Sequence, residues 1–171
     1  MDFFKTVDDR HSMRKFVETP IEDEKLQKIL ETANKAPSAG NLQGYEIYIV
    51  RKLEQRQALV KASWDQDFLA EAPVVLIFCA NPARSAERYK DRGIELYCIQ
   101  DATIACAFAI LATKAQGLDS VWVGAFNEAA VSEIAHIPSS LRPVVMLPIG
   151  YAGKAPSLRP RRELRDLVHE A

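Results

Sequence analysis

The sequence predicts a single domain of mixed helices and strands, of the α/β or α+β class. Segments with helical spacing of apolar residues alternate with short apolar runs typical of strands, and no internal repeat is present. The length of 171 residues suits one domain, residues 1–171, whose core needs no metal or disulfide. A hydrophobic content of 48% and a charged content of 26% exclude a disordered or fibrous chain.

The first predicted elements are a helix and a strand. Thr19-Pro20-Ile21-Glu22 matches a capping box with proline at the first helical position, so we expect the helix to begin there. Apolar residues from Leu26 to Ala33 follow at helical spacing, and the helix should end near Ala36-Pro37. The β-branched and aromatic run Tyr45–Val50 predicts a strand.

The middle of the chain predicts two further helices around a buried strand. Leu53–Ser63 has a helical pattern, and the continuous apolar run Pro73–Ala80 is typical of a strand covered on both faces. Residues 84–116 are mostly helical, with Gly93 as a break and Gly117 as a stop. Because 97–115 is apolar almost all round, we expect it at the centre of a core or against another subunit.

The last third predicts two strands, a short helix and an extended end. Ser120–Gly124 is a short strand, and Asn127 should cap a helix that reaches Ala135. Pro143–Ile149 is a further strand, in which Pro148 suggests an edge or a bulge. The proline-rich, basic run 151–165 is expected to be extended before a short turn.

Charge and cysteine content limit the partners and the location. The net charge of −1 argues against a nucleic-acid partner bound by bulk electrostatics. Cys79, Cys98 and Cys106 form no C-x-x-C pair, so we expect reduced, mostly buried thiols in a cytoplasmic protein. Residues 1–10 lack the apolar stretch of a signal peptide, and polar residues interrupt the apolar run 94–112. We therefore expect no membrane span.

Several common sites are missing from the sequence. Neither a G-x-G-x-x-G turn, a phosphate-binding G-x-x-x-x-G-K loop nor a G-x-S-x-G nucleophile elbow is present. His11, His136 and His169 lie far apart without partners at ligand spacing, so we expect no metal site.

Positive charge gathers near both ends of the chain. In an extended run, Arg10, Ser12 and Arg14 point to one side, where two guanidinium groups around a hydroxyl can chelate a phosphate. Arg159 and Arg161 also alternate onto one side of an extended segment, which Pro156 and Pro160 make rigid. The alternative for both clusters is solvated surface charge.

Two loops have the composition of a ligand contact. The run 36–43, A-P-S-A-G-N-L-Q, combines small side chains with hydroxyl and amide groups that can hydrogen-bond a planar heterocycle. Gly124 and Ala125 follow a short strand, and their backbone N–H groups are little shielded. Each loop is also compatible with an ordinary turn.

Together, in this order, these segments resemble the signatures of the nitroreductase family of FMN-dependent oxidoreductases. The matching segments are R-x-S-x-R-x-F at 10–16, A-P-S-A-G-N-L-Q at 36–43, G-L-x-x-x-W-V-G-A-F at 117–126 and R-P-R-R at 159–162. The resemblance spans residues 10 to about 165. It implies an α+β fold, with a mostly antiparallel sheet flanked by helices, assembled as an intertwined homodimer with FMN in two interface clefts.

The resemblance also implies roles for individual residues. Arg10, Ser12, Arg159 and Arg161 would hold the FMN phosphate and ribityl chain, and Arg14 would approach the pyrimidine end of the ring. Pro37, Ser38 and Asn41 would reach the flavin from the partner subunit, and Gly124 and Ala125 would present N–H groups near N5. His11, within the first cluster, completes the candidate cofactor-binding set. No protein nucleophile is expected, because the flavin carries the hydride chemistry.

The expected activity is FMN-dependent reduction of a nitro-aromatic, quinone or similar small acceptor, with NADH or NADPH as the reductant. This sequence departs from the usual N-x-Q-P-W with Asn41-Leu42-Gln43-Gly44-Tyr45, and it is short for the family, which implies an open pocket. Two alternatives remain: a dimer that stores or senses FMN with little turnover, and an oxyanion- or nucleotide-binding module without flavin. Trp64, Phe68, Tyr89 and Tyr97 are either pocket-lining residues or core and interface aromatics.

Overall fold

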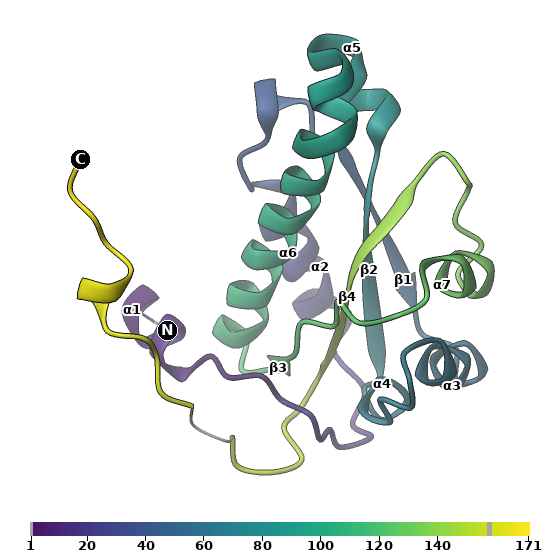
Figure 1. Ribbon diagram of the computed structural model, residues 1–171. Helices are drawn as coiled ribbons and strands as arrows, with labels where there is room; N and C mark the ends of the chain where they lie inside the picture. Colours follow the sequence, from purple (N-terminus) through teal and green to yellow (C-terminus); the bar gives the residue numbers. More distant parts are fainter. Residues whose placement is uncertain (1, 157–158) are drawn as a thin grey trace.

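The computed structural model describes residues 2–156 and 159–171 and places one antiparallel sheet between two layers of helices (Figure 1). The strands β1 (Tyr45–Val50), β2 (Val74–Ala80), β3 (Asp119–Ser120) and β4 (Arg142–Gly150) lie in the order β1-β2-β4-β3. Each neighbouring pair is antiparallel. The chain has the α+β fold that the resemblance implies.

Helices α2 (Asp23–Asn34) and α6 (Cys98–Ala115) cover one face of the sheet (Figure 1). Leu76 and Phe78 of β2 point into this layer and are fully buried, as is Ile29 of α2. Every residue of β2 is buried, as the apolar run 73–80 predicts, because helices cover both faces of this central strand. This layer fixes α6 against the sheet.

Helices α3 (Leu53–Ala62), α4 (Phe68–Glu71) and α7 (Glu128–Ile134) cover the opposite face (Figure 1). Val75 and Ile77 of β2 alternate into this second core, where they meet Leu59 of α3 and Val131 of α7. The predicted strand 45–50 and the Asn127 cap are confirmed, since the Asn127 side chain accepts the Ala130 N–H.

The long helical segment 84–116 is interrupted as predicted at Gly93. Helix α5 (Pro82–Arg92) leads into a π-turn, η2 (Gly93–Tyr97), and α6 follows. By length and composition alone, Pro82–Ala115 is apolar enough to cross a membrane. The sheet, however, buries one side of α6, so within this fold the apolar helix packs as a core helix.

Two expectations about chain geometry are wrong. The capping box does not start α2: the helix begins at Asp23 with Glu22 as its N-cap, and no side chain caps it. The Glu22 carboxylate instead accepts hydrogen bonds from Tyr151 and Lys25, a tertiary contact that local sequence does not reveal. Pro148 is also on neither an edge strand nor a bulge, because β4 lies between β2 and β3 and the register irregularity of the β2–β4 pair lies between Phe78 and Cys79.

The pairing of β4 explains how its interior tolerates Pro148. Met146 exchanges two backbone hydrogen bonds of 2.9 Å with Val123, and Ser120 pairs with Ile149 in the same register. Alternation along the strand therefore points the Pro148 nitrogen toward Val121. Because proline has no N–H, the ladder breaks there, and β3 ends at Ser120 instead of continuing to Gly124 as predicted.

Helix α1 (Phe3–Asp9) is missing from the predicted elements. Its apolar side chains Phe3, Phe4 and Val7 are 61%, 74% and 42% exposed, and Thr6 is its buried residue. The helix thus has no stripe facing the core of its own chain, which is the signal that periodicity detects. Figure 1 shows that α1 lies beside the C-terminal segment, away from the sheet.

Candidate functional site

A cavity of about 650 Å³ lies where the two ends of the chain meet. Segments more than 140 residues apart in sequence form its walls, because Arg159 and Arg161 face the segment that follows α1. The lining residues are Val7, Asp8, Arg10, His11, Ser12, Arg14, Arg159 and Arg161. The cavity therefore contains every candidate residue from the two basic clusters.

The run 10–16 is held extended by the edge of the sheet. The Met13 N–H donates to the Ser120 carbonyl at 3.0 Å, and Met13 and Phe16 are buried in a small core with Ala72. The intervening Ser12 and Arg14 are exposed, as the alternation predicts. His11 lines the same cavity as Arg10, Ser12 and Arg14, although strict alternation would point it to the other side. The chain leaves α1 at this point, so the alternation does not yet hold.

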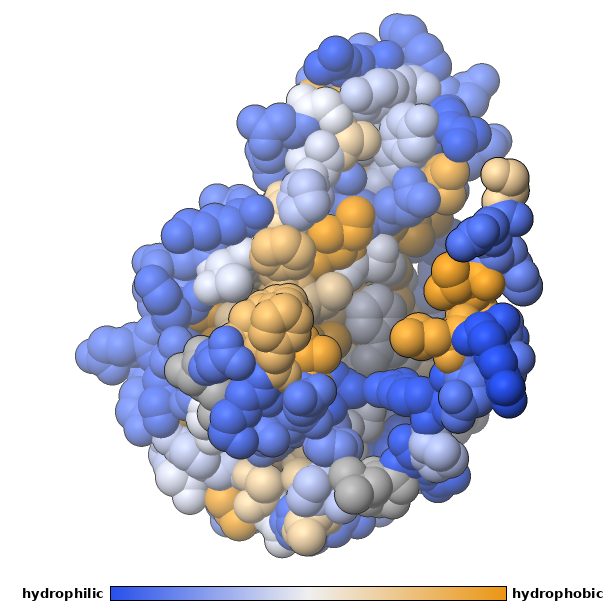
Figure 2. Space-filling view, turned by 90° about the vertical axis from the view of Figure 1, so that its left-hand side faces the viewer, coloured by the Kyte–Doolittle hydropathy of each residue, from blue (hydrophilic) through white to orange (hydrophobic). Residues whose placement is uncertain are grey.

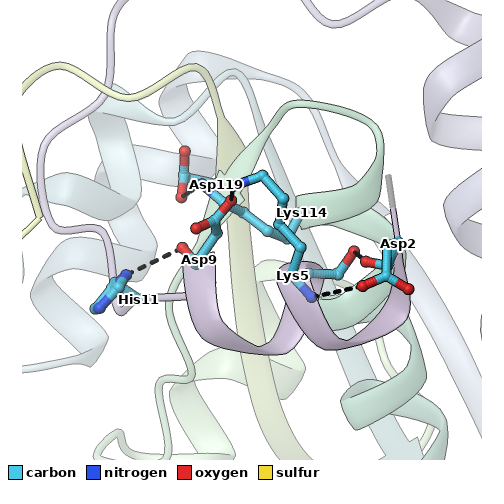
Figure 3. Close-up of polar contacts among 7 residues, drawn as sticks. Asp2, Lys5, Asp9, His11, Lys114 and Asp119 are labelled. Carbon is cyan, nitrogen blue, oxygen red and sulfur yellow. Dashed lines mark hydrogen bonds and ion pairs between the residues drawn. The ribbon is translucent and has the colours of Figure 1, made fainter.

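Helix α1 lies beside the end of α6, and short-range polar contacts hold α1 and the residues that follow it together (Figure 3). Asp2 caps α1 through the Lys5 N–H, and the Lys5 ammonium pairs with Asp9 at 2.9 Å. His11 Nδ1 donates to the Asp9 carbonyl at 3.0 Å, so the ring has a defined position at the start of the extended run.

A largely buried ion pair supports the adjoining edge of the sheet. Lys114 of α6 and Asp119 of β3 lie 3.0 Å apart, with side chains 20% and 11% exposed (Figure 3). Asp119 precedes Ser120, whose carbonyl holds Met13. The pair thus links α6 to the strand on which the extended run rests.

The cavity concentrates uncompensated positive charge. Among residues 2–156 and 159–171, the guanidinium groups of Arg10, Arg14, Arg159 and Arg161 form no ion pair and no side-chain hydrogen bond. Asp8 is the one carboxylate in the lining. Four converging guanidinium groups without partners fit an anion such as a phosphate, which accepts several charge-assisted hydrogen bonds.

The loop with Pro37, Ser38 and Asn41 lies at the other end of α6. Asp101, in the first turn of α6, accepts the Ala39 N–H at 2.9 Å, whereas the arginine cavity adjoins the last turn. An 18-residue helix is about 27 Å long, so the two candidate regions of one chain are far apart. The structure does not bring these three residues to the cavity of their own chain.

Gly124 and Ala125 follow the strand that borders the cavity. Both Gly124 and Ala125 are exposed. Gly124 also lines a second, smaller cavity together with Ile99 and Phe126. Ser120 and Gly124 are four residues apart along an extended run, about 13 Å. Their backbone groups are thus within reach of an elongated ligand that starts at the arginine cavity.

Two residues of this region were not found from the sequence. Gln66 donates its amide to the Ala125 carbonyl at 3.1 Å and to the Ser63 carbonyl at 3.0 Å, which ties two turns together. Asp101 holds the loop 39–44. Neither lies in a motif, because each contacts segments far away in sequence. Trp64, beside Gln66, is 67% exposed and is not a core residue of this chain.

Fold and site together place a cavity lined by four arginines beside the edge of an antiparallel sheet. The three thiols are buried, and in the described parts of the chain no cluster of His, Cys, Asp and Glu side chains can hold a metal ion.

Comparison with known proteins identifies the family. The family model described as "Nitroreductase family" matches residues 7–67 and 61–151. The FMN reductase (NAD(P)H) of Bacillus subtilis is 27% identical over 99% of this chain and 73% of that protein. A putative NADH dehydrogenase/NAD(P)H nitroreductase of Archaeoglobus fulgidus is 30% identical over 86% of this chain and 83% of that protein. The chain belongs to the nitroreductase family of oxidoreductases.

Solved structures confirm the fold. The NADPH:FMN oxidoreductase of Vibrio harveyi, complexed with NAD⁺, superposes with a TM-score of 0.90 at 27% identity, over 98% of this chain and 76% of that chain. Nitroreductase A of Vibrio parahaemolyticus gives a TM-score of 0.90 at 28% identity, over 99% of this chain and 75% of that chain. The family is usually dimeric.

Proposed function

We propose that this protein is an FMN-dependent NAD(P)H oxidoreductase that reduces small electron-poor acceptors such as nitro-aromatics or quinones. The observation that carries the proposal is the arginine cavity. Four guanidinium groups from both chain ends line it, and none has a carboxylate partner in residues 2–156 or 159–171. Guanidinium groups gathered in this way favour a bound anion, which can accept several charge-assisted hydrogen bonds from them.

The residues present fit FMN. The phosphate carries nearly two negative charges, and Arg10, Arg159 and Arg161 would bind it, with Ser12 as a further donor. His11 lines the same cavity and would sit beside this phosphate. When bound, FMN supplies hydride transfer, the chemistry for which this chain has no residue of its own.

The remaining candidate residues would influence how readily the flavin ring is reduced. Arg14, which also lines the cavity, would place a positive charge at the pyrimidine end of the ring and stabilise the reduced, anionic flavin. Gly124 and Ala125 would offer backbone N–H groups to the ring edge, and the Gln66 contact keeps their turn in place. The residues of this chain would thus bind, orient and polarise the flavin.

A homodimer would complete the site. Pro37, Ser38 and Asn41 lie at the opposite end of α6 from the cavity, so a second copy with α6 antiparallel would bring its own loop there. The outward face of α6 is apolar, with Ala107 and Ala115 exposed. Figure 2, which views the side with α1 and the C-terminal segment, shows hydrophobic side chains gathered inside a hydrophilic border. Such a patch on a cytoplasmic protein marks an interface.

Anaerobic reduction tests the function. The purified protein, loaded with FMN, is mixed with NADH or NADPH in a stopped-flow instrument, and oxidised acceptors are then added. We expect one nicotinamide to bleach the flavin band promptly and a nitro-aromatic or quinone to restore it. Protein that binds no FMN contradicts the proposal. Protein that binds FMN but is not reduced by either nicotinamide supports the storage or sensing alternative.

A further inference from the structure

The loop that joins α2 to β1 has an unusual backbone. Gly40, Asn41 and Gln43 have φ angles of +57°, +56° and +47°, in the left-handed region. This region is unfavourable for residues with a side chain, so Asn41 and Gln43 keep it only if surrounding contacts fix the loop.

Asp101 supplies those contacts from within the core. Its side chain is in the first turn of α6 and the residue is 2% exposed. Oδ1 accepts the Ala39 N–H at 2.9 Å, and Oδ2 accepts the Gly44 N–H at 3.1 Å. One carboxylate thus binds both ends of the loop, and in residues 2–156 and 159–171 it forms no ion pair, so these N–H groups compensate its charge.

The packing around Asp101 leaves no room for another arrangement. A Cβ on Gly44 would lie 2.3 Å from Ser85 Oγ and 3.0 Å from Asp101 Oδ2. Helix α5 adds two more contacts: the Asn81 N–H donates to the Gly44 carbonyl at 2.9 Å, and the Arg84 side chain donates to the Leu42 carbonyl. The loop is therefore clamped from α5 and α6 together.

The clamped loop turns particular atoms outward. The Gln43 N–H and side-chain amide donate to Ser38 Oγ, at 3.0 and 3.2 Å, and the same amide donates to Asn41 Oδ1 at 2.6 Å. The acceptor atoms of Ser38 and Asn41 are thus used inside the loop. Their donors, the Ser38 hydroxyl and the Asn41 NH₂ group, donate no hydrogen bond within residues 2–156 and 159–171 and can serve a ligand.

We propose that Asp101 is a positioning residue for flavin binding. It fixes the loop 38–44 so that the donors of Ser38 and Asn41 face the ring edge of the FMN held by the second copy. The inference rests on the proposed function, and it assigns to Asp101 a role through the loop, without contact to the flavin. A side chain in one protomer thereby controls the affinity of the site completed with the other.

Substitution of Asp101 by asparagine tests this role. The Asp101→Asn variant keeps the shape but turns an NH₂ group toward a backbone N–H, so one of the two contacts is lost. We expect its FMN dissociation constant to rise about tenfold, equivalent to about 1.4 kcal/mol. Hydrogen exchange of the 39–44 amides should accelerate in parallel. Cys106→Ser, in the buried middle of α6, is the matched control and should leave both quantities unchanged.

The outcomes separate this inference from the function on which it rests. Wild-type protein that binds no FMN would overturn both. Wild-type and Asp101→Asn proteins that bind FMN within twofold of each other would overturn the inference alone, as would an equal loss in Cys106→Ser. If Asp101→Asn does not fold, Gly44→Ala disturbs the same contact from the loop side. Its FMN affinity must then fall, and an unchanged affinity contradicts the proposal.

Discussion

At the scale of single residues, arginines that are close in sequence have different surroundings in the fold. Arg161 lines the cavity near Arg10, whereas Arg165, four residues further on, is 84% exposed and lies 4.0 Å from Asp166. The sequence run K-A-P-S-L-R-P-R-R-E-L-R does not distinguish them. The different surroundings give the two arginines different expected roles.

Arg161→Ala should weaken FMN binding, and Arg165→Ala should not. Loss of a charge-assisted hydrogen bond costs about 1.5–3 kcal/mol, so we expect the FMN dissociation constant to rise roughly 10- to 100-fold. Fluorescence titration of FMN measures it, and the effect should shrink as salt screens the site. Equal losses in the two variants would show that the cavity is not the phosphate site.

The Glu128 carboxylate contributes stability that depends on pH. Arg142 donates to it through Nε at 3.0 Å and Nη2 at 2.8 Å, and these hydrogen bonds lower the pKa of Glu128. A lowered pKa means that the contribution is present above the usual value of about 4.3 and is lost as the pH falls through the lowered one. Because both side chains are about half exposed, we expect no more than about 1 kcal/mol.

Urea unfolding of Glu128→Gln should therefore show a deficit near neutral pH that disappears near pH 3. Glu87→Gln, at an exposed position of α5, is the control and should match the wild type at both pH values. A deficit that stays constant with pH would mean that Glu128 acts through packing and not through its charge.

At the scale of elements, helices α6 and α7 end in the same motif with different residues. After α6, Gly117 (φ +76°) donates to the Lys114 carbonyl and Leu118 to that of Thr113. After α7, His136 (φ +53°) and Ile137 make the equivalent bonds. Both are Schellman turns, in which the left-handed position favours glycine. The sequence predicts the stop at Gly117 and a helix that reaches Ala135, but it does not predict that His136 takes the left-handed position.

Substitutions at these two positions should change the free energy of unfolding in opposite directions: Gly117→Ala should lower it and His136→Gly should raise it. Gly117→Ala meets no atom within 4 Å, so its cost is backbone strain alone, about 1 kcal/mol. His136→Gly removes that strain and should stabilise by about 0.5–1 kcal/mol. The free energy of unfolding in urea measures both. A destabilised His136→Gly would show that the imidazole makes contacts worth more than the strain.

At the scale of the whole molecule, several apolar side chains remain exposed on α1, on α6 and near the C-terminus. Phe3 and Phe4 on α1, Ala107 on α6, and Leu164 and Val168 near the C-terminus are all exposed. The candidate flavin ligands are likewise divided between the two ends of α6. Under the proposed function, a single chain would thus have its own hydrophobic core but only part of the flavin site.

Ala107→Glu should separate the proposed dimer and abolish FMN binding. A glutamate on an exposed helix costs a monomer little, within about 0.5 kcal/mol, but a buried, unpaired charge in an interface costs several times that. Sedimentation and FMN titration check the outcome. Ala129→Glu, on an exposed face of α7 across the sheet, is the matched control and should remain dimeric. A dimeric, FMN-binding Ala107→Glu would place the interface elsewhere.

Local sequence patterns and contacts between distant segments thus determined different parts of this structure. The sequence by itself determined most of the strands and helices, including the bounds of β1 and the burial of β2, because side-chain periodicity follows the surfaces that each element must bury. It also determined the chemical types in the site. It did not determine α1, which has no stripe facing the core of its own chain. Only the tertiary structure decided that residues 10–14 and 159–161 share one cavity, that the loop 37–43 lies at the far end of α6, and that Asp101 clamps it. These facts depend on the order in which strands pair and on contacts between distant segments, which no local pattern encodes.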